Sequence, residues 1–147
     1  MLSGPHLVHR DVKPDTVLLT CPLDARPIFV VCDFARACDL SNSADGYVMT
    51  RFLGSYVYAS PEARNGLCSF AQDVWAAGVL LYAIVTRCLP FENDDLLDET
   101  APVQPLIEDN LWEANAAVLL RGMLAWNWRI CFTAISARAL MSLLCEA

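Results

Sequence analysis

The stretch HRDVKPDT, residues His9–Thr16, determines the fold of this chain together with the tripeptide DFA, Asp33–Ala35. The first stretch places a carboxylate, Asp11, two residues before Lys13 and continues into a proline turn. Two apolar, β-branched segments follow it, separated by a turn segment with two prolines, and the second segment ends at Asp33. Apolar segments on either side of a turn predict a β-hairpin. The hairpin would deliver Asp33 to the edge of the site that contains Asp11.

The composition predicts one globular domain. The chain has 147 residues, of which 56% are hydrophobic and 18% are charged, and its formal net charge is −7. A domain of this length buries roughly 68–70% of its unfolded surface. The sequence contains no basic stretch of the kind that nucleic acids or anionic membranes select. We therefore expect neither a nucleic-acid partner nor a membrane partner.

The seven cysteines show no metal-binding spacing, because the sequence has no Cys-x-x-Cys pair and no paired histidines. The first residues are too polar and too interrupted by proline for a secretory signal. We therefore expect reduced thiols that pack as small buried hydrophobes in a cytoplasmic protein. The apolar run Val74–Val85 is shorter than the ~20 residues that a bilayer core requires, so a buried helix is the better interpretation.

The rest of the chain is predicted to be mainly helical, so the expected fold is mainly α with a short β-hairpin, in the α+β class. A long, continuous apolar stretch predicts a buried central helix at about residues 70–87, which Leu89–Phe91 would end. Pro61 can start a short helix. Two further helices are expected at Leu111–Leu124 and Thr133–Leu144, and exposed loops at Asp39–Tyr47 and at the acidic stretch Glu92–Glu99.

These stretches resemble the large lobe of a eukaryotic serine/threonine protein kinase, from the catalytic loop to the C-terminus. His9–Thr16 is similar to the catalytic loop, and Asp33–Ala35 to the metal-binding turn. The segment GSYVYASPE, Gly54–Glu62, is similar to the end of the activation segment, which would then span residues 33–62. The segment Asp73–Tyr82 resembles the central helix. The resemblance covers 1–147 as one kinase large-lobe domain and is most similar to the SH3-binding-domain kinases.

The resemblance implies phosphoryl transfer to serine or threonine of a protein substrate, with ATP and Mg²⁺ as cofactors. Asp11 is expected to orient the substrate hydroxyl, Lys13 to neutralise the transferred phosphate, and Ser55 to bridge the two. Lys13, Leu18 and Asp33 are expected to contact the nucleotide. Asp33 would bind Mg²⁺, with Thr16 as a weak second ligand.

Structural roles are implied for five further residues. His9 and Phe34 would stack on each other behind the catalytic loop. Arg10 would receive an activation-loop phosphate, and Asp73 would hydrogen-bond the backbone of the His9–Arg10 turn. Glu62 would form one half of a buried ion pair.

The sequence departs from the family pattern in four places. Thr16 replaces an asparagine that binds the second Mg²⁺, and Ala35 replaces a glycine, which restricts the backbone there. Cys131 stands where the arginine partner of Glu62 is expected, unless Arg129 substitutes by a small register shift. Finally, the residues before His9 are too few for the N-terminal lobe with its Gly-rich loop and lysine.

Two functions follow from this pattern. The first is the large lobe of a serine/threonine kinase, favoured by the joint presence of Asp11, Lys13 and Asp33, although without the other lobe we expect poor ATP binding and negligible turnover. The alternative is a pseudokinase fragment that acts as a non-catalytic scaffold or regulator, which the substitutions at residues 16, 35 and 131 favour.

Overall fold

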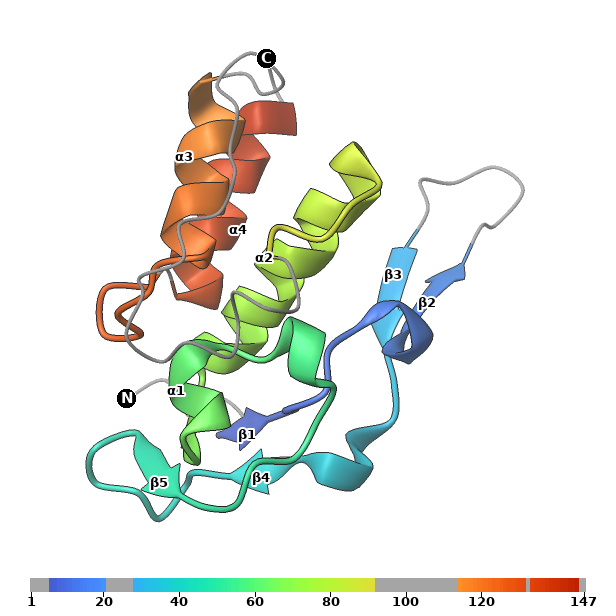
Figure 1. The fold of residues 1–147 in the computed structure, drawn as a ribbon. Coiled ribbons are helices and arrows are strands. Elements are labelled where there is room, and N and C mark those ends of the chain that lie inside the picture. Colours follow the sequence, from blue (N-terminus) through green and yellow to red (C-terminus); the bar gives the residue numbers. More distant parts are fainter. Residues whose placement is uncertain (1–5, 21–27, 92–113, 132, 146–147) are drawn as a thin grey trace.

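The computed structural model describes residues 6–20, 28–91, 114–131 and 133–145. Within these residues, four helices pack beside a set of short strand pairs (Figure 1). The helices are α1 (Pro61–Arg64), α2 (Ala71–Thr86), α3 (Ala114–Met123) and α4 (Ala134–Cys145), of which α1 is a single turn. The predicted turn at 21–27 and the acidic stretch at 92–99 lie outside the described residues.

Six short strands form three antiparallel pairs in the described part of the chain. Strand β2 (Val17–Thr20) pairs with β3 (Ile28–Val31), with Val17 opposite Val31, as the sequence predicted. Two pairs were not predicted, because strands of two or three residues are too short to show a periodic pattern. They are β1 (Leu7–Val8) with β4 (Cys38–Asp39), and β5 (Tyr47–Met49) with β6 (Leu67–Ser69).

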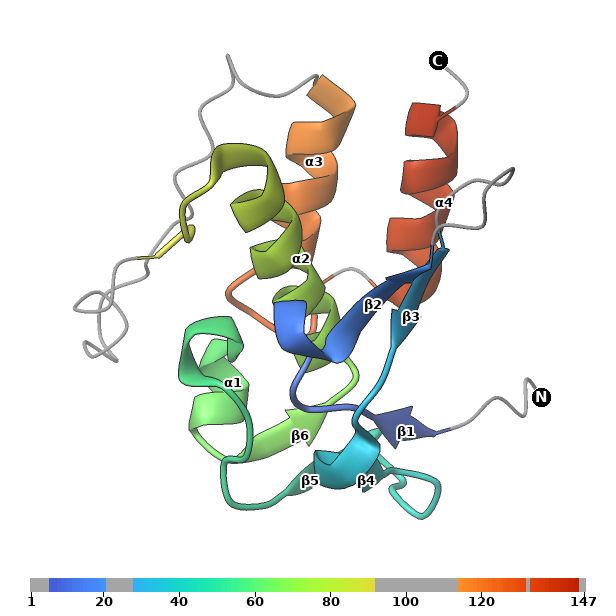
Figure 2. The ribbon, with the colours of Figure 1, turned by 90° about the vertical axis from the view of Figure 1, so that its right-hand side faces the viewer.

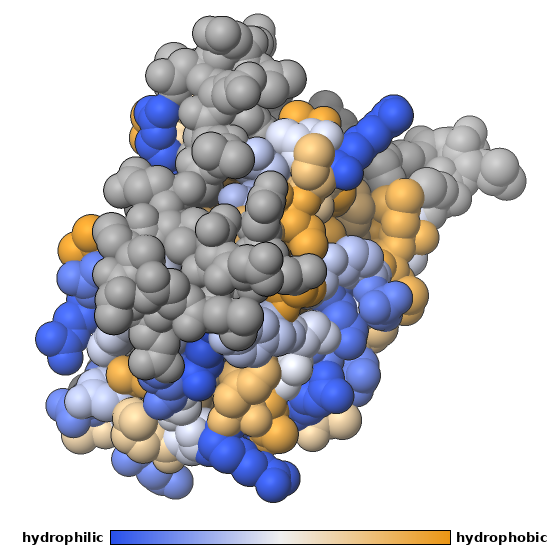
Figure 3. All heavy atoms as spheres, in the orientation of Figure 1, coloured by the Kyte–Doolittle hydropathy of each residue, from blue (hydrophilic) through white to orange (hydrophobic). Residues whose placement is uncertain are grey.

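The β2–β3 hairpin exposes apolar side chains along most of its length. Leu18 and Leu19 are 53% and 55% exposed, and Phe29 is 66% exposed. Figure 3 shows hydrophobic atoms at the right-hand side of the molecule, where Figure 1 places this hairpin. Residues that are β-branched or aromatic favour a strand conformation even where no second layer covers it in the described structure.

The core forms around α2, which lies beside α3 and α4 (Figure 2). One buried cluster joins α2 to α3 and to Phe91; its buried members are Trp75, Val79, Tyr82, Phe91, Leu120 and Leu124. A second cluster joins α2 to both α3 and α4; its buried members are Val74, Leu119, Met123 and Ala137. Gly78 allows α3 to approach closely, because a Cβ on this residue would lie 3.0 Å from Met123 Cβ and from Leu124 Cδ2. The apolar pattern of this segment therefore reflects helix packing.

The expectation that α2 is buried throughout is wrong for its last turn, where Ile84 and Val85 are 62% and 46% exposed. The bounds of the helix, Ala71–Thr86, agree with the expected range of about 70–87, and it ends just before Leu89–Phe91. Arg87 has φ 61°, and its N–H donates to the Ala83 carbonyl at 2.9 Å, which is a left-handed C-terminal cap.

Two smaller expectations also need correction. Leu40 lies within the loop predicted to be exposed but is 2% exposed, because it packs with Val8 and Cys68 in a third cluster. The cysteines are not uniformly buried, since Cys68 is buried whereas Cys88 is exposed. Over the described residues, no helix is long and apolar enough to cross a membrane. The same residues contain no group of three or more His, Cys, Asp or Glu side chains that could hold a metal.

Candidate active site

The N-terminal end of α2 fixes the backbone of the loop that follows β1. Asp73, in the first turn of the helix, accepts hydrogen bonds from the His9 N–H at 2.6 Å and the Arg10 N–H at 2.9 Å. Burial raises the pKa of Asp73 in spite of these two bonds. Arg10 has φ 70°, a conformation that costs free energy for a non-glycine residue, so this anchor holds the loop in an otherwise unfavourable state. The structure thus places Asp73 where the sequence predicted.

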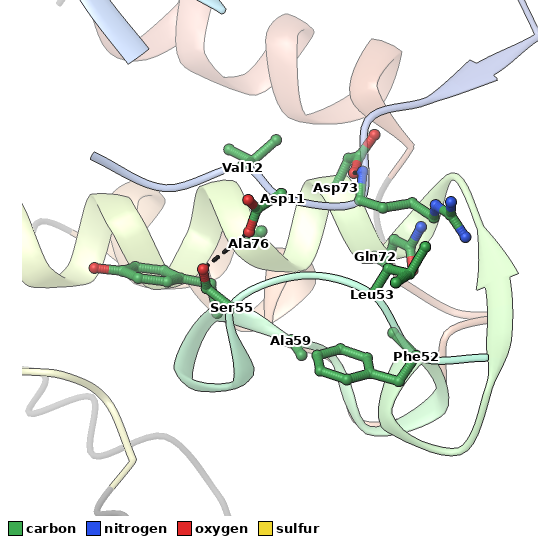
Figure 4. Close-up of a pocket in the computed structure, with 12 residues that line it drawn as sticks. Asp11, Val12, Phe52, Leu53, Ser55, Ala59, Gln72, Asp73 and Ala76 are labelled. Carbon is green, nitrogen blue, oxygen red and sulfur yellow. Dashed lines mark hydrogen bonds between the residues drawn. The ribbon is translucent and has the colours of Figure 1, made fainter. Parts of the chain in front are cut away.

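The side chains of Lys13 and Ser55 meet at Asp11, which is 4% exposed. The Ser55 hydroxyl donates to Asp11 Oδ1 at 2.9 Å (Figure 4), and Lys13 Nζ lies 3.2 Å from Asp11 Oδ2. Lys13 Nζ also donates to Ser55 Oγ at 3.0 Å, which closes a triangle. Burial alone would raise the pKa of Asp11, but the hydrogen bonds from Ser55 and Lys13 and the charges of Lys13 and Arg36 lower it overall. Asp11 is therefore an ionised carboxylate at neutral pH.

Arg36 is a fourth member of this group that the sequence did not predict. Its Nη1 forms an ion pair with Asp11 Oδ2, and its backbone carbonyl accepts a hydrogen bond from Arg10 Nε. The contact joins residues 25 positions apart, so spacing alone could not reveal it. The available signal was a basic residue immediately after Asp33–Ala35, on the turn expected to face Asp11.

The turn at Asp33 also packs on the loop as expected. The His9 and Phe34 rings meet edge to face with centroids 4.8 Å apart, and His9 Nε2 lies 2.9 Å from the Cys32 carbonyl oxygen. Asp33 has φ 65° and an exposed side chain, and its Oδ1 accepts from the Ala35 N–H at 3.4 Å. The left-handed conformation falls on Asp33 and Ala35 lies in a 3₁₀ turn, so the alanine is compatible with this geometry.

Thr16 does not fit its expected role as a metal ligand. It is 2% exposed, and its hydroxyl donates to the Asp11 carbonyl at 2.9 Å, with the Lys13 carbonyl at 3.1 Å. The same hydroxyl accepts from the Lys13 N–H at 3.1 Å. A hydroxyl has one proton and two lone pairs, so these contacts leave little capacity for a cation. Thr16 instead ties the two ends of the loop together.

The residues present fit a nucleotide with one Mg²⁺ ion better than one with two. Asp33 offers an exposed carboxylate, which is the kind of protein ligand that binds Mg²⁺ together with the phosphates of a nucleotide. Lys13 can contribute a positive charge, and Leu18 lies exposed on the neighbouring hairpin as an apolar surface. A second metal ion has no comparable oxygen ligand at Thr16.

The carboxylate oxygens of Glu62 are buried, although the residue as a whole is half-buried, and they lack the arginine partner that the family pattern implies. Neither carboxylate oxygen has a hydrogen-bond partner among the described residues, and burial raises the pKa of Glu62, partly offset by nearby Ser60 and Arg64. Burial and, to a smaller extent, the charge of Glu62 raise the pKa of the Cys131 thiol to about 12, so the two side chains are near enough to interact electrostatically. Arg129 does not substitute for the missing arginine, because its exposed guanidinium lies 5.1 Å from the Trp128 ring centroid.

Comparison with known proteins identifies the class. The model of the protein kinase domain family matches residues 3–138. The chain is 40% identical over 90 residues to the serine/threonine-protein kinase PEPKR2 of Arabidopsis thaliana, covering 61% of this chain and 18% of that kinase. It is 33% identical over 140 residues to the serine/threonine-protein kinase stk11 of Xenopus laevis, covering 86% of this chain and 29% of that one. The chain therefore belongs to the protein kinase family, and it spans less than a third of the length of these relatives.

Proposed function

We propose that this chain provides the catalytic loop of a serine/threonine protein kinase, which transfers a phosphoryl group from ATP to a protein hydroxyl. The observation that supports this most directly is the triangle of Asp11, Lys13 and Ser55, with its three separations of 2.9, 3.0 and 3.2 Å. A carboxylate that stays ionised, beside a cation that is held in place, is what alignment of a hydroxyl next to a phosphate requires.

Each residue has a separate task in this proposal. Asp11 accepts a hydrogen bond from the substrate hydroxyl and takes its proton as transfer proceeds. Lys13 neutralises charge on the transferred phosphoryl group, and Ser55 fixes the distance between Lys13 and Asp11. Asp33 holds the metal side of the nucleotide, while bound Mg²⁺–ATP would supply the reactive phosphoryl group. The substrate class, the use of ATP and the cytoplasmic location stay predictions, as does the likeness to the SH3-binding-domain kinases.

A non-catalytic scaffold is the second candidate, because two observations favour it. The Thr16 hydroxyl is committed to backbone groups, which leaves the second metal position without a ligand. The apolar hairpin residues, with Leu18 at 53% and Phe29 at 66% exposed, offer a surface that a protein partner could cover.

The test is phosphoryl transfer by the natural polypeptide that carries this segment, purified from its source with and without Asp11→Asn. Labelled ATP, Mg²⁺ and a set of serine and threonine peptides are the reagents. We expect Asp11→Asn to lower transfer by about 10²- to 10⁴-fold, because a positioned base contributes that much. Asp15→Asn is the matched control, since Asp15 is an exposed carboxylate of the same loop. Transfer that is equal in the parent and in Asp11→Asn would refute the kinase proposal and support the scaffold.

The metal argument has its own variant. Thr16→Asn would retain a donor for the Asp11 carbonyl and add an amide oxygen for a second Mg²⁺. We expect transfer to rise most at high Mg²⁺ concentration. An unchanged Mg²⁺ dependence would show that Thr16 does not limit metal binding.

A further inference from the structure

We propose that Arg36 is a removable latch on Asp11, which closes the site to a hydroxyl substrate while the ion pair is formed. The proposal rests on the proposed function, because it assigns a regulatory role to a contact with the expected base. It concerns one interaction, the ion pair between Arg36 Nη1 and Asp11 Oδ2.

Three of the roughly four acceptor positions of the Asp11 carboxylate are already occupied. Oδ1 accepts from the Ser55 hydroxyl at 2.9 Å, and Oδ2 faces both Lys13 Nζ, at 3.2 Å, and Arg36. Because the Asp11 side chain is only 2% exposed, the surrounding chain covers the remaining position. A substrate must therefore displace one of the groups around Asp11.

Arg36 is the group that can leave at the lowest cost. Its side chain is 44% exposed, whereas that of Lys13 is 21% exposed and is bound to Ser55 as well. The Arg10 Nε donates to the Arg36 carbonyl, so the backbone stays in place while the long side chain rotates toward solvent. A partly exposed ion pair favours the state in which Arg36 contacts Asp11 over the state in which it does not by a factor of about five or less in the equilibrium constant. A bound substrate can overcome so small a preference.

The latch can be tested by carboxylate labelling, without measuring catalysis. The full chain is treated with a water-soluble carbodiimide and glycinamide, and tandem mass spectrometry compares modification of Asp11 with that of the exposed Asp15. Amides formed with glycinamide and with Lys13, the nearest amine, are both counted. We expect Arg36→Ala to raise the ratio of Asp11 to Asp15 labelling about three- to fivefold. Arg51→Ala, which removes an exposed arginine from the activation segment, should leave the ratio unchanged.

A second measurement on the unchanged protein guards against a variant that does not fold. Raising the ionic strength from about 0.05 M to about 1 M shortens the screening length from roughly 14 Å to 3 Å and weakens an exposed ion pair. The labelling ratio of the parent chain should then rise, and the rise should be absent in Arg36→Ala. A ratio that responds to neither salt nor Arg36→Ala overturns the latch.

Labelling and phosphoryl transfer can fail independently. If the ratio rises in Arg36→Ala and transfer increases with it, the latch regulates a working kinase site. A rise in labelling without any transfer supports the latch and refutes the kinase proposal. Transfer that depends on Asp11 while labelling stays insensitive to Arg36 supports the kinase proposal and overturns the latch.

Discussion

The buried carboxylate of Glu62 gives the sharpest prediction about stability. We predict that Glu62→Gln stabilises the fold near pH 7.5. An uncompensated buried charge costs about 3–5 kcal/mol when its partner is removed. Glu62 is only partly buried, and the charge of Arg64 offsets some of this cost. We therefore expect the free energy of unfolding to rise by about 1–2 kcal/mol, which corresponds to roughly 2–8 °C in Tm for a domain of this size.

The pH dependence follows from the raised pKa of Glu62. The ordinary pKa is 4.5 and the folded-state pKa is higher, so between the two values the folded state binds more protons than the unfolded state. Stability of the parent chain therefore falls as pH rises through that window and stays low above it. Below pH 4.5 the carboxyl is protonated in both states. The advantage of Glu62→Gln should accordingly vanish there.

The measurement is urea unfolding of the parent and of Glu62→Gln at about pH 4 and pH 7.5, with the exposed Asp15→Asn as control.

Cys131→Arg provides an independent test, because it brings a guanidinium near Glu62. We expect Cys131→Arg to stabilise the parent but not Glu62→Gln. If Glu62→Gln is neutral at pH 7.5, or if Cys131→Arg gains the same in both backgrounds, the carboxylate is not an uncompensated buried charge.

Three further predictions test the loop that carries the site. Asp73→Asn replaces one of the two carboxylate oxygens that accept from the loop by an amide donor. The free energy of unfolding, measured in urea, should fall by about 2–3 kcal/mol, and hydrogen exchange of the amides in residues 9–11 should accelerate. Ser55→Ala removes a hydrogen bond that lowers the pKa of Asp11, so NMR titration should find that pKa higher; no change would contradict the bond to Asp11 Oδ1. Gly54→Ala should lower Tm more than Gly46→Ala does. Both residues have positive φ, at 132° and 74°, but only a Cβ at residue 54 would collide with the Arg10 carbonyl. Equal losses of Tm would refute that contact.

The elements that could be predicted from the sequence are those whose pattern is local. The apolar stretch of α2 and the β-branched segments of the hairpin each carry enough residues to define a period or a turn. Strands β1 and β4 have two residues each, and their pairing depends on a contact between positions about 30 residues apart. Leu40 shows the same limit, because a polar neighbourhood predicts exposure whereas the chain folds it onto Val8.

The candidate site divides in the same way. Asp11, Lys13, Ser55 and Asp73 were predicted because a family motif fixes their spacing, and the structure brings them together. Arg36 was missed because its position depends on the left-handed backbone at Asp33, which the modest preference of aspartate for this conformation is too weak to predict.

The departures from the family pattern act on different properties of the molecule. Cys131 supplies no charge opposite the buried carboxylate of Glu62, which only partly interacts with Arg64, so we expect this departure to lower stability without touching the contacts of Asp11. Thr16 donates a hydrogen bond to the Asp11 carbonyl, and we expect its replacement of asparagine to affect metal binding and not this contact. We therefore expect the pairing of Asp11 with Lys13 and Ser55 to tolerate both substitutions. Arg36, by contrast, acts on Asp11 itself. Among the side chains that contact Asp11, it is thus the one whose removal should change access to the carboxylate without changing the fold.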